Sequence, residues 1–313
     1  MKILLYPEIH ENYGTGNVYR MYYLYKFLLN FSSIDDVLFT CNKIQLAEKL
    51  ILELGENIFL SKLETEERYD VILYDSIKPN EYLLKQLKSL SRKLIVLDYF
   101  NYSNNNIDII INLFEQSNKD KSLFNGKIYE GINFFILKDE IMANKKNPKT
   151  IFKSKPDILI TFGGEDPNDN TLKVLKNINL NKFRVKVIIG RLNKKNKKII
   201  ELYSKQVEII DHTPEIGKLM SQSDIIICGG GTTLLEAIYL GNPVIAIPQN
   251  NMEEKFINYI NQNVHLFKLR DLEWLINKYK DIQFRKSIYN SYSNFVDGKG
   301  KNRIKQIIFS RSF

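Results

Sequence analysis

The sequence predicts an α/β protein of two Rossmann-like domains, each built on a parallel sheet. Short apolar runs rich in Ile, Leu and Val alternate with longer amphipathic stretches along nearly the whole chain, a pattern typical of βαβ units. A polar, basic stretch with two prolines divides this series near its middle. The length of 313 residues also suits two domains of roughly 150 residues each.

The first half contains five apolar runs that predict strands. Their near-continuous apolarity indicates strands buried on both faces, as in a parallel sheet covered by helices. Helical periodicity occupies the intervals between several of them. We expect strands at residues 2–6, 36–40, 70–75, 93–98 and 107–113, and helices at residues 17–30, 43–54 and 80–91. This series is the predicted N-terminal domain, residues 1–143.

The stretch NKKNPKTIFKSKP, residues 144–156, has no apolar period and is the predicted linker. A second α/β series follows, and it predicts a C-terminal domain at residues 157–300. An amphipathic helix at residues 301–310 is expected within a separate closing segment, residues 301–313. Strands of the second domain are expected at residues 157–162, 184–190, 207–210, 223–229 and 243–248.

The composition excludes several classes of protein. With 44% hydrophobic and 26% charged residues, the chain contains no apolar run near the roughly 20 residues that cross a bilayer. The first apolar segment is too short for a signal peptide, so we expect a first strand in a cytoplasmic protein. Cys41 and Cys228 lie far apart in or beside apolar runs, which indicates reduced core residues. Neither a metal site nor a cofactor is predicted.

The net charge of +9 raises the expectation of an anionic partner. The most basic run is GRLNKKNKK, residues 190–198, and a solvated helix face or turn explains it without a ligand. Because no nucleic-acid-binding module is recognisable, we expect no nucleic acid partner. Two anionic partners remain as candidates: nucleotide phosphates, and a lipid surface that the protein contacts peripherally.

Three predicted strands lead directly into glycine-rich turns. In open α/β sheets, ligands bind outside the carboxyl ends of strands, where glycine allows close approach and helix N-termini favour anions. The clearest turn is GGGTT, residues 229–233, whose amides suit a diphosphate, while a tight turn without ligand is the alternative. One helical turn later Glu236 suits a ribose diol or complements the helix dipole. The phosphate-binding P-loop pattern is absent, and Tyr19 breaks the dinucleotide-binding glycine pattern.

Together these residues resemble the GT-B nucleotide-sugar proteins, whose two sheets face a cleft. The segment SDIIICGGGTTLLEAIYLGNPVIAIPQNNMEEKFINYI, residues 223–260, is similar to the lipid II-forming N-acetylglucosaminyltransferases. Over most of the chain the resemblance is to UDP-sugar hydrolases of the pseudaminic acid pathway and to spore-coat polysaccharide proteins. It includes YGTGNVYRMYYL, residues 13–24, and ILITFGGEDPNDNTLKVL, residues 158–175.

The resemblance implies a UDP-sugar held in the cleft, with the nucleotide on the C-terminal domain and the sugar and its acceptor on the N-terminal domain. By position it assigns the phosphates to the loop amides, the ribose to Glu236 and the uracil to the segment at residues 210–214. The nucleotide-binding residues it implies are Gly163, Gly164, His212, Gly230, Gly231, Thr232, Thr233 and Glu236. The resemblance and the position of the first glycine turn also place five residues beside the substrate: Gly14, Gly16, Asn17, Arg20 and Asp75.

Two positions depart from the hydrolase pattern. The hydrolases have a water-activating histidine where this chain has Asn17, and an amide has no basic nitrogen near neutral pH. They also have a tyrosine soon after the aspartate of the third strand, where this chain has Ser76 and Ile77. The candidate bases are His10, Glu11 and Glu8 in the first loop and Asp98 at the end of the fourth strand, with His10 the most attractive because an imidazole is poised near neutral pH. Arg20 could pair with a phosphate or sugar substituent, or form a structural ion pair.

Three hypotheses about function follow. The first is an inverting, metal-independent glycosyltransferase that moves a sugar from UDP to a glycan or sugar acceptor in surface-polysaccharide synthesis. The second is a hydrolase of the pseudaminic type that releases UDP from a 2,4-diacetamido-2,4,6-trideoxy sugar nucleotide. The third is a catalytically inactive nucleotide-sugar binder. Release of UDP with and without acceptor distinguishes them.

Overall fold

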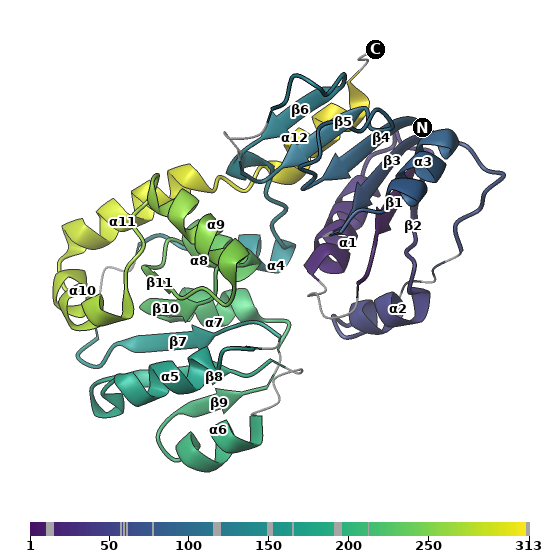
Figure 1. The fold of residues 1–313 in the computed structure, drawn as a ribbon. Helices are drawn as coiled ribbons and strands as arrows, with labels where there is room; N and C mark the ends of the chain where they lie inside the picture. Colours follow the sequence, from purple (N-terminus) through teal and green to yellow (C-terminus); the bar gives the residue numbers. More distant parts are fainter. Residues whose placement is uncertain are drawn as a thin grey trace. The chain divides into compact units, whose positions relative to one another are not determined.

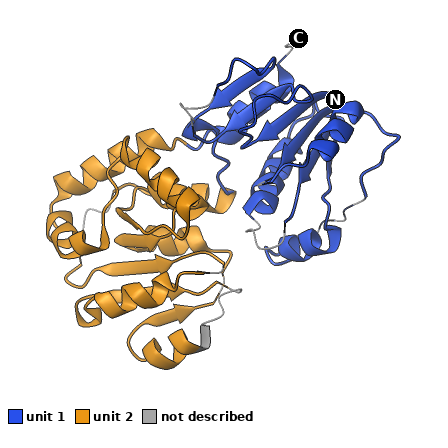
Figure 2. Ribbon diagram, in the orientation of Figure 1, with its two compact units in different colours: residues 1–138, 298–313 blue, residues 139–297 orange. Residues whose placement is uncertain are grey.

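The computed structural model describes residues 1–10, 16–56, 58, 60, 62–76, 78–114, 120–148, 153–164, 166–190, 196–211 and 213–310. The chain divides into two compact units (Figure 2). Unit 1 comprises Met1–Lys138 and Gly298–Phe313, and unit 2 comprises Asp139–Asp297. Each unit is built around one parallel sheet (Figure 1).

Unit 1 contains a six-stranded sheet in the order β2-β1-β3-β4-β5-β6, counted over the described residues. Every neighbouring pair is parallel. The strands are β1 (Lys2–Pro7), β2 (Asp36–Phe39), β3 (Tyr69–Asp75), β4 (Ser91–Leu97), β5 (Ile109–Asn112) and β6 (Lys127–Glu130). The helices are α1 (Gly16–Leu28), α2 (Ile44–Leu52), α3 (Glu81–Leu90), the short η1 (Ile132–Phe134) and α12 (Gly300–Phe309).

The unit 1 sheet is buried on both faces because successive side chains of a strand point to opposite sides. Ile3 and Leu5 of β1 belong to a core that also includes residues of α1, α2 and α12. Leu4 and Tyr6 belong to a second core on the side of α3. This arrangement explains the continuous apolar runs, since both sides of each central strand need apolar side chains.

The C-terminal helix α12 packs within unit 1, instead of forming the separate segment expected from the sequence. Its Ile304, Ile307 and Ile308 join the same core as β1. The buried Lys93 of β4 donates from Nζ to the carbonyl oxygens of Ile307 at 3.3 Å, Ile308 at 3.2 Å and Ser310 at 2.7 Å. A lysine therefore satisfies carbonyl groups that the end of α12 leaves without helical partners.

Unit 2 contains a five-stranded parallel sheet in the order β11-β10-β7-β8-β9, counted over the described residues. The strands are β7 (Asp157–Thr161), β8 (Arg184–Ile188), β9 (Glu208–Ile210), β10 (Ile225–Cys228) and β11 (Val244–Ala246). The helices are α4 (Asp139–Ala143), α5 (Asn170–Asn177), η2 (Leu180–Lys182), α6 (Asn196–Tyr203), α7 (Ile216–Gln222), α8 (Thr232–Leu240), α9 (Asn251–Asn261), η3 (Leu269–Asp271), α10 (Leu272–Tyr279) and α11 (Ile282–Phe295).

The boundary between the units falls at residue 138, before the basic stretch predicted as a linker. Glu140 of α4 accepts hydrogen bonds from the backbone N–H groups of Gly217 at 3.0 Å and Lys218 at 3.1 Å. The Nζ atom of Lys145 lies 4.1 Å from the centre of the Tyr239 ring. These contacts attach residues of the predicted linker and the helix before it to unit 2.

The predicted fold class, two α/β units with parallel sheets, is confirmed, and all ten predicted strands are present within a few residues. Strand β6 was not predicted. It is an edge strand whose four residues are exposed or half-buried, so its sequence KIYE lacks the apolar run of a central strand. In the described part of the chain, no helix is both long and apolar enough to span a membrane.

Candidate functional site

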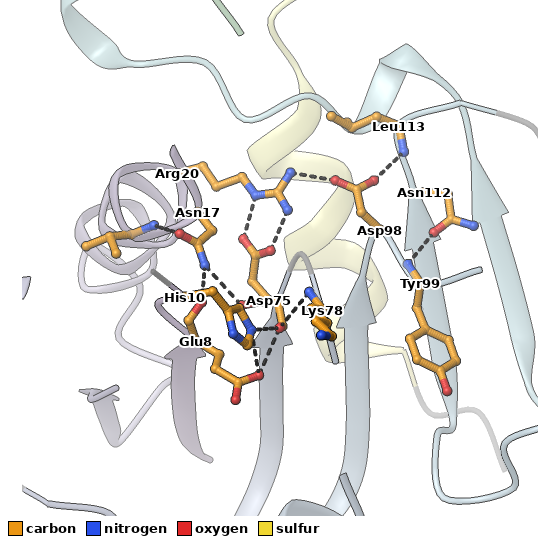
Figure 3. A network of polar contacts seen from close by, with 12 residues as sticks. Glu8, His10, Asn17, Arg20, Asp75, Lys78, Asp98, Tyr99, Asn112 and Leu113 are labelled. Carbon is orange, nitrogen blue, oxygen red and sulfur yellow. Dashed lines mark hydrogen bonds and ion pairs between the residues drawn. The ribbon is translucent and has the colours of Figure 1, made fainter. Parts of the chain in front are cut away.

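Polar residues gather at the carboxyl edge of the unit 1 sheet (Figure 3). Glu8 directly follows β1, Asp75 ends β3, and Asp98 directly follows β4. Strands β1, β3 and β4 are adjacent and parallel, so their carboxyl ends meet at one edge. The backbone N–H of Glu8 donates to the carbonyl of Asp75 at 2.8 Å, which continues the pairing beyond the strand. This edge is where open α/β sheets bind ligands.

Asn17 is buried and bonded to backbone groups. Its side-chain N–H group donates to the carbonyl of Glu8 at 2.7 Å and to that of Asp75 at 3.3 Å. Its Oδ1 accepts from the N–H of Val18 at 3.0 Å. Asn17 therefore joins the start of α1 to the ends of β1 and β3, and contact with substrate remains a prediction.

Arg20 bridges two of the strand-end aspartates. Its Nε donates to Asp75 at 2.5 Å, a second bond runs from Nη2 to the other oxygen of Asp75, and Nη1 donates to Asp98 at 2.6 Å. Burial opposes the charge on Arg20, but the two carboxylates more than compensate and raise the pKa of the guanidinium. The sequence analysis allowed Arg20 either a ligand contact or a structural ion pair. In this structure Arg20 forms ion pairs with two residues, Asp75 and Asp98.

Asp98, another candidate base, accepts hydrogen bonds through both of its carboxylate oxygens. One carboxylate oxygen binds Arg20, and the other accepts from the backbone N–H of Leu113 at 3.0 Å. Its backbone has φ of +51°, in the left-handed region that aspartate tolerates better than most residues. These bonds use both carboxylate oxygens and link β4 to the segment after β5, and a role of Asp98 as base remains a prediction.

His10 lies within a second polar cluster, formed with Glu8, Tyr74 and Ser76, of which Figure 3 labels His10 and Glu8. Its Nε2 is 2.9 Å from Ser76 Oγ and 3.4 Å from Glu8 Oε2. Ser76 donates to the same Glu8 oxygen at 2.8 Å, and the Tyr74 hydroxyl also donates to it. Glu8 is 7% exposed, whereas the His10 side chain is 22% exposed. His10 is therefore the more accessible member of this cluster.

In unit 2 the glycine turn after β7 leaves room beside it. A Cβ built on Gly163 or on Gly164 would meet no described heavy atom within 4 Å. Gly163 has φ of +73°, which favours glycine. Asp166 accepts from the N–H groups of Asn170 at 2.8 Å and Thr171 at 2.9 Å, thereby capping the start of α5. The turn is compatible with a phosphate beside it.

The turn after β10 is different because helix α9 packs closely on it. A Cβ on Gly230 would lie 2.8 Å from Glu253 Cβ, so glycine is required there even without a ligand. One carboxylate oxygen of Glu253 accepts from the backbone N–H groups of Gly230 at 2.8 Å and Gln249 at 2.9 Å. The amide of Gly230, which the sequence predicts for a diphosphate, is therefore bonded to a side-chain carboxylate in this structure.

The other predicted nucleotide residues lie at the start of α8. Gly231 precedes the helix, Thr232 is exposed and Thr233 is half-buried, so the first residues of α8 lie at the surface. Glu236 is 1% exposed, and its contact with a ribose remains a prediction. Three predicted site residues, Glu11, Gly14 and His212, lie outside the described residues. Gly16 begins α1, and a Cβ built on it would meet no heavy atom of the described residues within 4 Å.

Sequence reasoning did not assign roles to Tyr74, Ser76 and Glu253. The sequence contained a signal for Glu253, because Asn250 followed three residues later by Glu253 is a helix-start pattern. Asn250 does accept from the Glu253 N–H at 2.9 Å. Tyr74 and Ser76 carried no such signal, since their partners are more than 60 positions away in the chain.

A cavity of about 840 Å³ lies at the opposite edge of the unit 2 sheet. It is lined by the amino ends of β7 and β8, where Asp157 pairs with Lys153 and with Arg184. Ligands of open α/β sheets bind at the carboxyl ends of strands. The cavity is therefore separate from the candidate site, although it is large.

Comparisons with known proteins find similarity in sequence and in fold. Residues 158–290 match the glycosyltransferase family 28 C-terminal domain. An uncharacterised protein of Methanocaldococcus jannaschii, MJ1062, is 28% identical over 91% of this chain, which spans 64% of that protein's length. The spore coat polysaccharide biosynthesis protein SpsG of Bacillus subtilis is 26% identical over 82% of this chain and 81% of its own length.

Solved structures share the whole fold at low sequence identity. UDP-GlcNAc 2-epimerase from Neisseria meningitidis, bound to UDP-GlcNAc, has a TM-score of 0.60 at 13% identity and covers 98% of this chain and 99% of its own. MurG from Acinetobacter baumannii has a TM-score of 0.61 at 9% identity and covers 98% of both chains. The two parallel-sheet units and these structural neighbours define the fold of the chain as GT-B. More particularly, residues 158–290 of unit 2 are similar to the glycosyltransferase family 28 C-terminal domain, and the chain is similar to SpsG over most of its length.

Proposed function

We propose that this chain is a UDP-sugar-dependent glycosyltransferase acting in the synthesis of a surface polysaccharide or a related glycan. The observation that carries the proposal is the match of residues 158–290 to the glycosyltransferase family 28 C-terminal domain. That range includes the glycine turn after β10 and the start of α8. The similarity to SpsG supports a polysaccharide product.

The proposed reaction needs two contributions from the chain. Amide groups at the start of α8 stabilise the diphosphate as it leaves, together with the positive end of the helix dipole. A base removes the proton from the acceptor hydroxyl as that oxygen attacks the anomeric carbon from the opposite face, so the configuration inverts. The proposal assigns no metal to either contribution.

His10 is the proposed base. An imidazole is suited to proton transfer near neutral pH, and the His10 side chain is partly exposed at the carboxyl edge of the unit 1 sheet. Asp98 is engaged by Arg20 and by the Leu113 N–H. His10→Ala is expected to lower the rate by about 10² to 10⁴, the usual contribution of a general base. His265→Ala, which changes an exposed histidine of unit 2, serves as the matched control.

The test of function incubates the purified chain with a panel of UDP-sugars and measures UDP release with and without a glycan acceptor extract. Release that depends on the acceptor supports transfer. Release without acceptor would replace the proposal with hydrolysis. Binding of UDP without release under either condition would replace it with an inactive nucleotide-sugar binder.

The nucleotide assignment has its own test in calorimetric titration with UDP. Glu236→Gln is expected to weaken UDP binding by about tenfold, equivalent to the roughly 1.4 kcal/mol of one hydrogen bond. Glu254→Gln, an exposed residue of α9, should leave the affinity unchanged. Equal affinities of the two variants would remove Glu236 from the nucleotide site.

A further inference from the structure

One carboxylate holds backbone amides of the turn after β10, beside the start of α8 where the proposed function places the diphosphate. Glu253 Oε2 accepts from the N–H groups of Gly230 at 2.8 Å and Gln249 at 2.9 Å. The other oxygen, Oε1, accepts from the Gln249 side chain at 3.3 Å. A Cβ built on Gly231 would lie 3.8 Å from Oε1. The carboxylate therefore lies against the residues that lead into α8.

The start of α9 does not by itself account for these bonds. In a capping box, the acid at the third helical position bonds to the N–H of the N-cap residue. Asn250 is the N-cap of α9 and accepts from the Glu253 N–H at 2.9 Å. The Glu253 carboxylate bonds instead to the residue before Asn250, and to Gly230, 23 positions away. Glu253 therefore reaches across from its own helix to the turn of another strand.

The negative charge of Glu253 is held by dipoles alone. Among the described residues, the partners of its carboxylate are backbone and amide N–H groups, and none of them is a cation. Burial raises the pKa of the Cys228 thiol at the end of β10, and the charges of Glu253 and Glu236 raise it further. A diphosphate at the start of α8 would therefore meet a like charge that no cation neutralises, and neighbouring like charges repel.

We propose that Glu253 is an internal competitor of the diphosphate: its carboxylate holds the Gly230 N–H until a diphosphate displaces it, and its return promotes the release of UDP. This inference rests on the proposed function, which places UDP at this turn. A carboxylate and a phosphate are both oxyanions that bind backbone N–H groups, so they compete for the same donor. Cleavage of the bond between sugar and phosphate leaves a further negative charge on UDP. Glu253 therefore repels the product more strongly than the substrate.

The carboxylate can leave the turn without disturbing α9. Glu253 is half-buried, and its neighbours Met252 and Glu254 in the first turn of the helix are exposed. Rotation about the side-chain bonds is therefore enough to bring the carboxylate into water, where hydration replaces the N–H bonds that it gives up. The bond from the Glu253 N–H to Asn250, which caps the helix, does not involve the carboxylate and stays in place.

Calorimetric titration with UDP tests the competition, with Glu254→Gln as the matched control in the same helical turn. Glu253→Gln removes the charge but keeps the length of the side chain and an oxygen that accepts hydrogen bonds. We expect Glu253→Gln to bind UDP about tenfold more tightly than the unaltered chain, and Glu254→Gln to bind it equally well. Unchanged or weaker binding by Glu253→Gln, or no binding of UDP by any of these proteins, would overturn the proposal.

The displacement can be followed in the unaltered chain by ¹H–¹⁵N correlation spectra, so the test does not depend on the folding of a variant. The Gln249 N–H shares its acceptor with Gly230, and the proposal gives it no contact with the diphosphate. We expect saturating UDP to shift the signals of both residues, because the carboxylate leaves both N–H groups. A Gln249 signal that stays in place would mean that Glu253 does not move, which contradicts the proposal.

The outcomes separate this inference from the proposed function. Tighter binding of UDP by Glu253→Gln, together with no release of UDP from any UDP-sugar, would support the competition and contradict the transfer reaction. Acceptor-dependent release of UDP with equal UDP affinity of Glu253→Gln and the unaltered chain would support the transfer reaction and contradict the competition.

Discussion

Asn17 donates its side-chain N–H to the backbone carbonyl oxygen of Glu8 over 2.7 Å, which joins the start of α1 to the end of β1. A second bond reaches the carbonyl of Asp75 at the end of β3. The amide group suits this place because it can donate to two carbonyl oxygens while its own oxygen accepts from Val18. An asparagine at position 17 therefore has a structural explanation.

The first prediction concerns Asn17→Asp, which keeps the size of the side chain but removes the donor. A carboxylate would face two carbonyl oxygens in a buried place, so the variant should lose about 1–3 kcal/mol of unfolding free energy. Urea denaturation followed by circular dichroism measures the loss. Asn30→Asp, at an exposed turn after α1, is the control, and equal stability of the two variants would contradict the prediction.

The second prediction concerns Arg20→Met. Removing the guanidinium leaves the fully buried Asp75 carboxylate without its cation, and breaking a buried pair from one side typically costs about 3–5 kcal/mol. Arg92→Met should cost less than about 1 kcal/mol, because the Arg92 side chain is 83% exposed in its pair with Asp70. A similar loss in both variants, measured by urea denaturation, would show that the buried bridge contributes little.

The third prediction concerns the attachment of α12. Lys93→Met removes three bonds to carbonyl oxygens at the end of that helix. We expect hydrogen exchange of residues 300–309 to accelerate at least tenfold relative to the strands of the same sheet. Lys85→Met, on the exposed side of α3, should leave the exchange unchanged. Unaltered protection of α12 in Lys93→Met would mean that its apolar contacts alone hold it.

The fourth prediction concerns the two thiols, which the structure describes as free and buried. Burial raises the pKa of the Cys41 thiol to about 11 and also raises the pKa of Cys228. Because the thiolate is the reactive form and forms only as the pH approaches the pKa, neither residue should react with a thiol reagent at pH 8. Urea should expose both, and rapid reaction of the folded protein would contradict this.

Much of the fold could be predicted because it depends on local patterns. The apolar runs of β1, β3 and β4 are continuous since both faces of those strands are covered, and this is visible in the sequence. The half-exposed edge strand β6 lacks that pattern and was missed. The basic stretch looked like a linker because its composition gives no indication that Lys145 packs against Tyr239.

The candidate site could be predicted only in part. Glycine turns and strand-end aspartates are local features, so Gly163, Gly230 and Asp75 were recognised from the chain itself. Their partners were not, because the packing of Glu253 on Gly230 depends on how α9 folds back over the turn. A sequence pattern indicates that amides are available, but it does not identify the group that binds them.

The sequence by itself determined the α/β class, the positions of nearly all strands and the presence of histidine and acidic residues in the first loop. Only the tertiary structure decided what those residues do. Glu8 and Ser76 are 68 positions apart, and they meet because β1 and β3 are adjacent, parallel and in a register that pairs Pro7 with Asp75. At the same strand ends, Asn17 bonds to the backbone of Glu8 and Arg20 bonds to Asp75. His10 lies beside Ser76 at this edge.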